Sequence, residues 1–195
     1  SRWITGEAAR TYGHRLRARY HAIAIGVGTL LTDDPRLSVR LVHGTDPVPI
    51  VFDSGLRCVA AEARPQLLRQ GTLVLHGPQA TAAAREALAA TGAEGIEVAT
   101  DEGGTIDVDA ALVALGRRPI RSLLVEGGGR LLGSFVAAGA WQRFFLFQAP
   151  RLLGAGIPAL ADVGWPTVAQ APHPQIIRRR RLGDDLLTVL APREG

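Results

Sequence analysis

The chain has 195 residues, 47% of them hydrophobic, and a formal net charge of +4, which favours a single domain over residues 1–195 with one core. Its one cysteine, Cys58, excludes a disulfide framework within the chain and a zinc site of several cysteines, and favours a reducing compartment such as the cytoplasm. Charged residues and prolines interrupt the apolar runs before the roughly twenty residues that a membrane span needs, so we expect no membrane partner.

The chain opens with a predicted helix and a predicted strand. Residues 5–19 have helical spacing, with Thr5 suited to the N-cap and arginines, including Arg17, on the exposed side. The apolar run 21–26 predicts a strand. The Gly-Val-Gly-Thr sequence of residues 26–29 predicts a glycine turn after that strand.

Two neighbouring carboxylates follow this turn. Asp33 and Asp34 precede Pro35, which forces the chain out of the helical region, so both side chains are expected on a loop. Such pairs are often solvated turn formers. With Arg36 and Arg40 close by in the sequence, they also suggest the polar rim of a site.

Strands and helices alternate through the middle of the chain. The predicted order is strand 47–52, strand 72–76, helix 81–90, strand 96–99, helix 107–115 and strand 122–125. This alternation argues for a largely parallel sheet with helices on both faces. The later strands are predicted at 144–148, 175–182 and 186–190. Because a very short turn joins the last two, they form an antiparallel hairpin, so we expect an α/β fold of three layers with one mixed, mostly parallel sheet.

A second glycine turn, residues 127–129, follows the strand 122–125. It leads into a helix predicted to begin at Arg130 and to end before Gly139, which suits the C-terminal cap. The backbone N–H groups of such a turn lie at the positive end of the helix dipole, where a pyrophosphate can approach main chain that has no Cβ. A tight crossover from strand to helix also favours glycine without any ligand, so both interpretations stay open.

The residues after the turn bear on which nucleotide it could bind. A fold that holds NAD by its ribose usually has an acidic residue about twenty positions after the glycines, but none occurs between Glu126 and Asp162. This favours a cofactor with a 2′-phosphate or a different fold. A P-loop is excluded because all 22 basic residues are arginine and that loop needs a lysine.

Other chemistries are disfavoured. The five histidines lack metal-ligand spacing, so no metal site is expected, and no Gly-x-Ser-x-Gly elbow suggests a serine nucleophile. The arginines at 178–181 could contact nucleic acid, but in a strand they alternate between faces and no aromatic residues lie between them for base stacking. We therefore expect no nucleic-acid partner, and a charged edge strand or a subunit contact instead.

Four separated motifs occur in a specific order. They are Ser-x-Trp-Ile-Thr at 1–5, followed by Arg17; Gly-x-Gly-Thr at 26–29 with Leu-x-Asp-Asp-Pro-x-Leu-x-x-Arg at 31–40; Phe-Asp-Ser at 52–54; and Val-Glu-Gly-Gly-Gly at 125–129. From residue 1 to about residue 192 the chain thereby resembles the reductase domain of the bacterial bifunctional riboflavin-biosynthesis deaminase/reductase. The resemblance implies a dihydrofolate-reductase-like fold and NADPH-dependent reduction of 5-amino-6-(5-phosphoribosylamino)uracil to 5-amino-6-(5-phosphoribitylamino)uracil.

The resemblance also implies site residues. For NADPH they are Trp3, Thr29, Asp33, Ser54, Gly128, Gly129, Arg130, Leu131, Leu132, Gly133 and Ser134. For the substrate they are Ser1, Arg17, Leu37, Arg40 and Glu126, the two arginines being suited to its 5′-phosphate. Glu126 and Asp33 are the candidates for catalytic carboxylates. Which group acts as general acid stays open.

Two features of the family are missing. Its upstream strand and Ser-Leu-Asp-Gly turn, and its zinc-binding deaminase half, do not occur in the sequence, which also contains no methionine. We therefore expect a piece of a longer protein that lacks its N-terminal strand and could carry a deaminase upstream. A homodimer is expected from the apolar stretch 141–147 and from the family. The alternatives are a dihydrofolate- or pterin-type reductase and a non-catalytic nucleotide-binding module.

Overall fold

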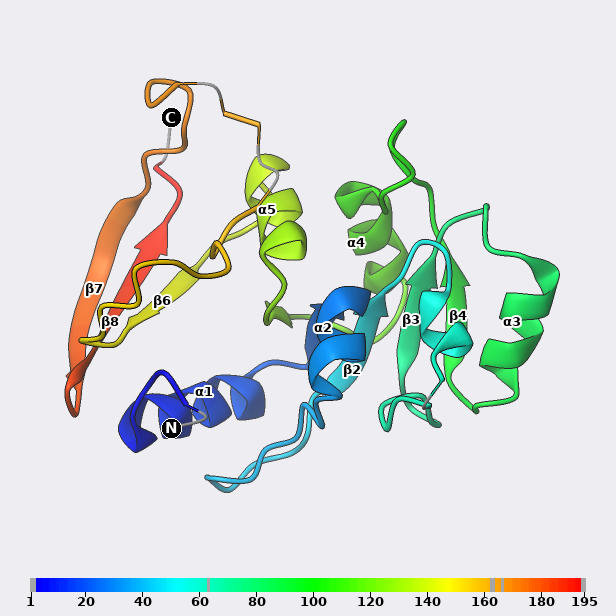
Figure 1. Cartoon of the computed structure of the whole chain (residues 1–195), viewed down its shortest axis with the longest axis horizontal. Helices are drawn as coiled ribbons and strands as arrows, with labels where there is room; N and C mark the ends of the chain where they lie inside the picture. Colours follow the sequence, from blue (N-terminus) through cyan, green and yellow to red (C-terminus); the bar gives the residue numbers. More distant parts are fainter. Residues whose placement is uncertain (1–2, 63, 162–163, 166, 194–195) are drawn as a thin grey trace.

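The computed structural model describes residues 3–62, 64–161, 164–165 and 167–193 (Figure 1). The helices are α1 (Glu7–Arg19), α2 (Val27–Asp33), the 3-10 helix η1 (Arg57–Ala60), α3 (Ala82–Ala89), α4 (Val108–Gly116) and α5 (Gly129–Ala137). The strands are β1 (Ala22–Gly26), β2 (Val48–Phe52), β3 (Leu73–His76), β4 (Glu94–Glu97), β5 (Leu123–Val125), β6 (Phe144–Gln148), β7 (Gln175–Leu182) and β8 (Asp185–Ala191).

Five strands form a parallel sheet in the order β4-β3-β2-β1-β5. In β1, Ile23 and Ile25 belong to a hydrophobic cluster with residues of α2 and α3, whereas Ala22 and Ala24 belong to a cluster with residues of α4 and α5. All four side chains are buried. Because helices cover both faces, β1, β2 and β3 are nearly continuous apolar runs, whereas the edge strand β4 is largely exposed. The predicted α/β class with three layers is confirmed.

Strands β6, β8 and β7 form a second sheet, which is antiparallel, in that order. The β7–β8 hairpin turns at Gly183 and Asp184, with a positive φ of 66° at Gly183, so the predicted hairpin is confirmed. The described strands do not form the single mixed sheet that was expected. Helix α5 instead carries the chain from the edge of one sheet to the edge of the other (Figure 1).

Helices α3 and α4 begin where the sequence predicts. Thr81 Oγ1 accepts a hydrogen bond from Ala84 N–H (3.1 Å), and Asp107 Oδ1 accepts one from Ala110 N–H (2.7 Å). Each cap satisfies a backbone donor that the first helical turn leaves without a partner. No helix in the described ranges has both the length and the apolar content for a membrane span.

The glycine turn predicted at residues 26–29 is wrong. Gly26 is the N-cap of α2, and the helix begins at once with Val27. Val27 and Leu30 are buried in the core cluster. Their packing outweighs the helix-breaking tendency of Gly28, which costs about 1 kcal/mol relative to alanine.

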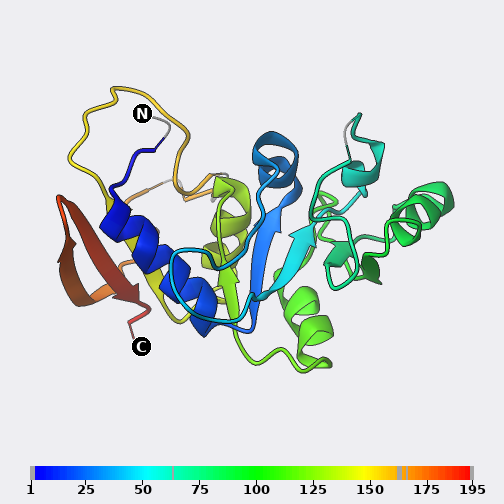
Figure 2. The same cartoon turned by 90° about the horizontal axis from the view of Figure 1, so that it is seen from below.

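Helix α1 connects to the antiparallel sheet. Its N-cap is Gly6, so the prediction of Thr5 as N-cap is wrong. Asp185 Oδ2 of the hairpin accepts a hydrogen bond from Gly6 N–H (2.7 Å), and Ala9 packs with Leu187 and Val189 of β8. Seen from below, α1 lies alongside this sheet (Figure 2).

Candidate active site

Pairing of β1 with β5 brings two segments of the predicted site together. Ala24 is paired with Val125, and Glu126 N–H donates to Ala24 O (2.8 Å). The start of α2 and the glycine turn before α5 therefore lie side by side, at the carboxyl ends of parallel strands. In open α/β sheets this edge is where ligands bind.

The glycine turn has clear local reasons for its composition. Gly127 and Gly128 have positive φ angles of 72° and 79°, which L side chains rarely adopt. A Cβ on Gly128 would lie 3.2 Å from Thr29 Oγ1, and one on Gly129 would lie 2.6 Å from Pro158 O. Gly129 is covered by the β6–β7 connection, with Ala161 N–H donating to Gly129 O (3.0 Å). Gly127 and Gly128 remain exposed, so the turn is open on one side.

The residues of α5 after the turn use their side chains for packing. Leu131 is buried in the core and Gly133 is buried too, while Leu132 faces the main cavity. The Ser134 hydroxyl donates to Arg130 O of its own helix (3.1 Å). No described side chain caps the N-terminus of α5. Contact of this segment with an anion would therefore come mainly from backbone N–H groups.

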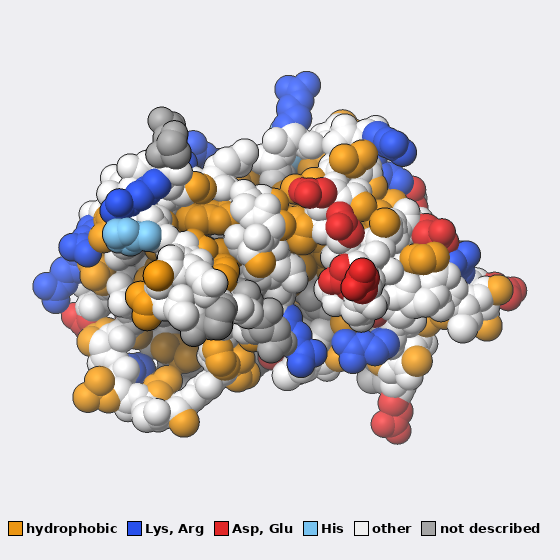
Figure 3. Space-filling view, turned by 90° about the horizontal axis from the view of Figure 1, so that it is seen from above, with side chains coloured by type: hydrophobic (Ala, Val, Ile, Leu, Met, Phe, Trp, Pro, Cys, Tyr) orange, Lys and Arg blue, Asp and Glu red, His pale blue; other side chains and the backbone are white. Residues whose placement is uncertain are grey.

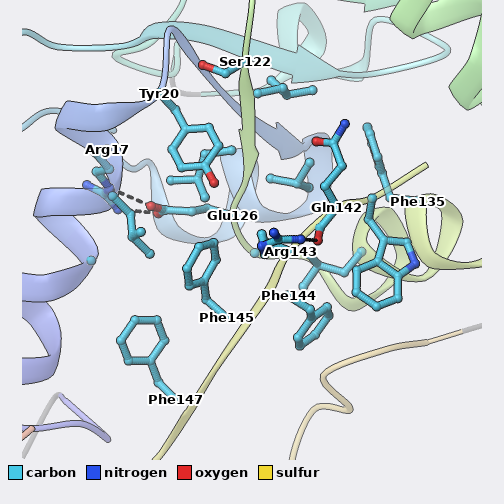
Figure 4. Close-up of a pocket in the computed structure, with 18 of the residues that line it drawn as sticks. Arg17, Tyr20, Ser122, Glu126, Phe135, Gln142, Arg143, Phe144, Phe145 and Phe147 are labelled. Carbon is cyan, nitrogen blue, oxygen red and sulfur yellow. Dashed lines mark hydrogen bonds and ion pairs between the residues drawn. The ribbon is translucent and has the colours of Figure 1, made fainter. Parts of the chain in front are cut away.

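A cavity of about 830 Å³ separates the two sheets. Its walls come from β5 and the glycine turn on one side, from β6 on the opposite side, and from α1, α4 and α5. Phe144, Phe145 and Phe147 of β6 line it and are half-buried (Figure 4). The apolar stretch 141–147, which was expected to favour a dimer surface, thus lies largely along this cavity.

An ion pair lies at the polar end of the cavity. Arg17 Nε and Nη2 donate to Glu126 Oε1 and Oε2, at 2.9 and 2.6 Å (Figure 4). The side chains are 18% and 28% exposed, so the expectation that Arg17 lies on the exposed side of α1 is wrong. A bidentate geometry orients both groups more strictly than a single contact does. Two residues predicted to bind substrate are thus in contact, although 109 positions separate them.

His14 belongs to the same polar cluster and was not predicted. It lines the cavity with Arg17, Arg40 and Glu126, and its Nδ1 accepts a hydrogen bond from Arg40 N–H (3.1 Å). Burial lowers the pKa of His14 below its usual 6.5, and the positive charges of Arg17 and Arg40 act in the same direction. A lone histidine without a motif gives no signal in the sequence. Its one clue is its position three residues before Arg17.

The carboxylate pair is divided between two roles. Asp33 ends α2 and is exposed. Asp34 is the left-handed C-cap of the helix, with a φ of 38°, and its Oδ1 accepts a hydrogen bond from Gln66 N–H (2.9 Å). Asp34 also accepts the Gln66 side-chain amide at its carbonyl oxygen. Asp34 therefore tethers a loop, although its side chain is exposed like that of Asp33.

The other predicted site residues lie in different surroundings. Leu37 has a positive φ of 53° and its side chain lies in the core, so only its main chain could meet a substrate. Ser54 follows β2 and is half-buried. Trp3 lines the cavity, and the guanidinium of Arg10 lies 5.3 Å from the centre of its ring. Ser1 is outside the described residues.

Cys58 and Asp53 form a buried contact beside Ser54. Asp53 Oδ2 accepts a hydrogen bond from Cys58 N–H (2.8 Å), and Oδ1 has no hydrogen-bond partner among the described residues. Burial raises the pKa of the Cys58 thiol far above its usual value, and the Asp53 carboxylate adds to the shift. A thiol in this state is a poor nucleophile. Within the described ranges, no three metal-ligating side chains gather into a possible metal site.

Comparison with known proteins identifies the family. A family model described as the RibD C-terminal domain matches residues 1–188. The chain belongs to the RibD C-terminal domain family. Riboflavin biosynthesis protein RibD of Mycobacterium tuberculosis (strain ATCC 25618 / H37Rv) is 36% identical over 99% of this chain and 49% of its own length. The protein of the same name from Bacillus amyloliquefaciens is 30% identical over 100% of this chain and 53% of its own length. The chain thus spans about half the length of these relatives.

Solved structures agree on the fold of the RibD C-terminal domain family. Acinetobacter baumannii RibD, form 1, superposes with a TM-score of 0.78 at 24% identity, over 100% of this chain and 52% of its own. The Thermotoga maritima protein described as a diaminohydroxyphosphoribosylaminopyrimidine deaminase/5-amino-6-(5-phosphoribosylamino)uracil reductase gives 0.74 at 24% identity, over 98% and 50%. At these identities the likeness shows the fold alone.

Proposed function

We propose that the protein reduces 5-amino-6-(5-phosphoribosylamino)uracil to 5-amino-6-(5-phosphoribitylamino)uracil in riboflavin biosynthesis, with NADPH as the donor. The observation that carries the proposal is the meeting of the exposed glycine turn and the Arg17–Glu126 pair at the carboxyl edge of one parallel sheet. Membership of the RibD C-terminal domain family and the reductase names of relatives support it.

The residues around the turn fit a dinucleotide. Gly127 and Gly128 are exposed, so backbone without a Cβ is open to an approaching anion, and the N-terminus of α5 favours negative charge. We assign the backbone N–H groups of residues 128–131 to the pyrophosphate, because Leu132 N–H already donates to Gly128 O (3.1 Å) and the later N–H groups of α5 are bonded within the helix. We assign Trp3, Thr29, Asp33 and Ser54 to the rest of the cofactor. When bound, reduced nicotinamide supplies a hydride, and the protein has to position it and exclude water.

The polar end of the cavity fits the phosphorylated substrate. Arg40 is exposed on the cavity rim, and its guanidinium group can bind phosphate by two hydrogen bonds. Arg17 already donates to Glu126 and to Ser38 O, so it would add positive charge and its remaining N–H donors. Glu126 accepts from Arg17 and can also accept from sugar hydroxyls or the pyrimidine edge. Ser1 and the main chain of Leu37 complete the proposed substrate contacts.

The proposed reaction adds one hydride and one proton to the substrate. The ribosylamino ring opens to a C1′=N imine, C1′ receives the hydride, and the nitrogen takes up one proton, which leaves the ribitylamino product and NADP⁺. Glu126 would orient the substrate through its carboxylate, and Asp33 would contact the cofactor. The proton donor has no assignment among these residues.

We propose that a segment of the full-length protein outside residues 1–195 adds a strand between β5 and β6. Among the described residues, β5 pairs with β1 alone and β6 with β8 alone, so each has an unpaired edge along the cavity. Trp3 and Thr5 also line the cavity. A helical crossover such as α5 joins parallel strands of one sheet, so a strand in the gap would join the two sheets and cover the apolar wall.

Hydrogen exchange tests this added strand. The amides of β5 and β6 on the edges that face the cavity should exchange slowly in the full-length protein and quickly in a protein of residues 1–195, whereas the amides paired with β1 and β8 are protected in both. The amides of β2 serve as an internal control because both its neighbours are present. Equal exchange of β5 and β6 in both proteins would contradict the added strand.

The relatives' length supports a further domain upstream, for which we propose the deaminase.

We also propose a homodimer. Its surface would include exposed apolar side chains of the β6–β7 connection, among them Leu152, Ile157 and Val168. Hydrophobic side chains are exposed at many places on the face shown in Figure 3. Light scattering measures the mass, and cell fractionation tests the proposed cytoplasmic location.

Kinetics and NADPH titration of the full-length protein test the proposed reduction. Arg40→Ala and Glu126→Gln should each raise KM or lower kcat for the pyrimidine at least about tenfold, the loss of one charged contact. If both variants retain wild-type KM and kcat, the site assignment is wrong. Binding of NADPH without turnover would favour a nucleotide-binding module, and turnover of dihydrofolate in place of the pyrimidine would favour a pterin-type reductase.

A further inference from the structure

His14 and Arg17 both bind the irregular segment that carries Arg40. They are three residues apart on α1 and so share a helix face. His14 Nδ1 accepts from Arg40 N–H (3.1 Å), and Arg17 Nη1 donates to Ser38 O (3.2 Å). Residues 34–40 have no helix or strand of their own. Asp34 is held by Gln66, and Val39 N–H donates to Asp46 Oδ1 (2.7 Å), so the contacts with α1 are part of a set that fixes backbone outside any strand ladder, and the contact of His14 is the one at Arg40 itself.

We propose that His14 is a positioning residue, which in its neutral form holds the main chain of Arg40 so that the guanidinium meets the substrate phosphate. This inference rests on the proposed function of Arg40 and adds to it the group that places Arg40. His14 is 8% exposed, and it does its work through a backbone contact, so it needs no contact with the substrate.

The proposal makes phosphate binding sensitive to acid. Because Nδ1 is an acceptor, the neutral ring carries its proton on Nε2. The charged groups around the ring are Arg17, Arg40 and Glu126, of which the two arginines oppose protonation and Glu126 favours it, as does the Ser38 carbonyl. Once Nδ1 is protonated it cannot accept from Arg40 N–H. The hold on Arg40 is then lost, and a third positive charge joins the two arginines.

The lowered pKa of His14 sets the direction of the pH effect. Burial lowers the pKa of folded His14 below 6.5, so acidification protonates the unfolded chain first. His14 therefore contributes stability that is present above pH 6.5 and is lost as the pH falls from there through the lowered pKa. Substrate affinity should fall at the lower end of this window, where the folded protein takes up the proton.

Steady-state kinetics of the full-length protein between pH 5 and 8 test the proposal. His14→Gln keeps a neutral acceptor that does not titrate, and His14→Leu removes the acceptor. At pH 8, His14→Leu should raise KM for the pyrimidine about tenfold with kcat nearly unchanged, the size of one lost hydrogen bond, while His14→Gln should stay close to wild type. Because the substrate phosphate also titrates near pH 6, the ratio of wild-type KM to His14→Gln KM is the quantity to follow, and it should rise as the pH falls.

A second readout does not need activity. In protein labelled with ¹⁵N-arginine, the Arg40 amide signal, assigned by its loss in Arg40→Lys, should move with pH in wild type and not in His14→Gln. If that signal does not titrate, His14 does not hold Arg40 and the proposal is wrong. If the Arg40 amide signal titrates but neither wild type nor the variants reduce the pyrimidine, the positioning contact is supported and the proposed function is wrong. A KM ratio that is constant with pH, in an active enzyme, overturns the link to substrate.

Discussion

The parallel and antiparallel sheets of this chain are stabilised in different ways. Every residue of β3 is buried, and helices pack on the two faces of the parallel sheet in two core clusters. In contrast, seven of the eight residues of β7 are exposed, and the four residues 144–147 of β6 are only half-buried. The antiparallel sheet shares a cluster of four buried residues with α1. Packing on both faces thus stabilises β3 within this chain. In contrast, β6 has a neighbouring strand on one edge and the cavity on the other.

Two matched substitutions in the cores should show this difference most strongly. Leu75 and Leu187 are both fully buried, one in the parallel sheet and one in the antiparallel sheet. Leu75→Ala should lower the free energy of unfolding by about 4 kcal/mol, and Leu187→Ala by about 2 kcal/mol, because the smaller cluster can relax around the gap. Urea unfolding measures both. The comparison fails if Leu187→Ala is the more costly.

The ion pair that joins the two regions should affect function more than stability. Arg17 lies on α1 and Glu126 follows β5, so Arg17→Ala should raise KM for the pyrimidine about tenfold or more. It should change the free energy of unfolding by less than about 1 kcal/mol, since both side chains are partly exposed.

Arg118 is the matched control. Its Nη1 and Nη2 make a bidentate contact with Glu94, at 3.1 and 2.6 Å, within the parallel region and away from the cavity. Arg118→Ala should leave KM at the wild-type value. An equal rise in KM for both variants would mean that the effect is general and not specific to the site.

The tether of α1 to the hairpin should have an intermediate effect on stability. Asp185 is 3% exposed and accepts from Gly6 N–H, so Asp185→Ala should cost about 1–2 kcal/mol by leaving that donor without its partner. Asp184 next to it is 92% exposed, and Asp184→Ala should stay within about 0.5 kcal/mol. Thermal unfolding of both variants checks the difference, and equal melting temperatures would contradict it.

The arginines of β7 should matter least. Arg179 is exposed, whereas the guanidinium of Arg180 lies 5.9 Å from the Tyr12 ring centre. Arg179→Ser should change stability by less than about 0.5 kcal/mol, and Arg180→Ser by slightly more. Fluorescence anisotropy with a single-stranded oligonucleotide should show no specific binding by wild type. Tight binding that either variant abolishes would restore the nucleic-acid interpretation.

The strands of the parallel sheet could be predicted from the sequence, whereas the arrangement of the two sheets could not. The parallel strands could be predicted because apolar runs such as Val48–Phe52 end at turn residues, and the caps Thr81 and Asp107 mark their helices. Helix α2 could not be predicted, because two glycines among the four residues 26–29 are typical of a turn. Only the tertiary packing of Leu30 shows that these residues begin a helix. The separation of the sheets depends on which strand edges pair, which local patterns do not encode.

The candidate site was predicted in part. The motifs point to Arg17 and Glu126, but no pattern says that they form an ion pair or that Arg17 faces inward. His14 has no motif, and its role is visible only from its contact with Arg40, 26 positions away. Asp34 resembles a site residue in the sequence, but its contact with Gln66 shows a structural role.

The most direct test of the proposed reduction uses NADPH with deuterium at the transferable position of C4. With 5-amino-6-(5-phosphoribosylamino)uracil and the full-length protein, mass spectrometry should find one deuterium at C1′ of the ribitylamino product. Glu126→Gln should slow the transfer without changing the labelled position. A product without deuterium, or oxidation of NADPH with the pyrimidine unchanged, would contradict the account.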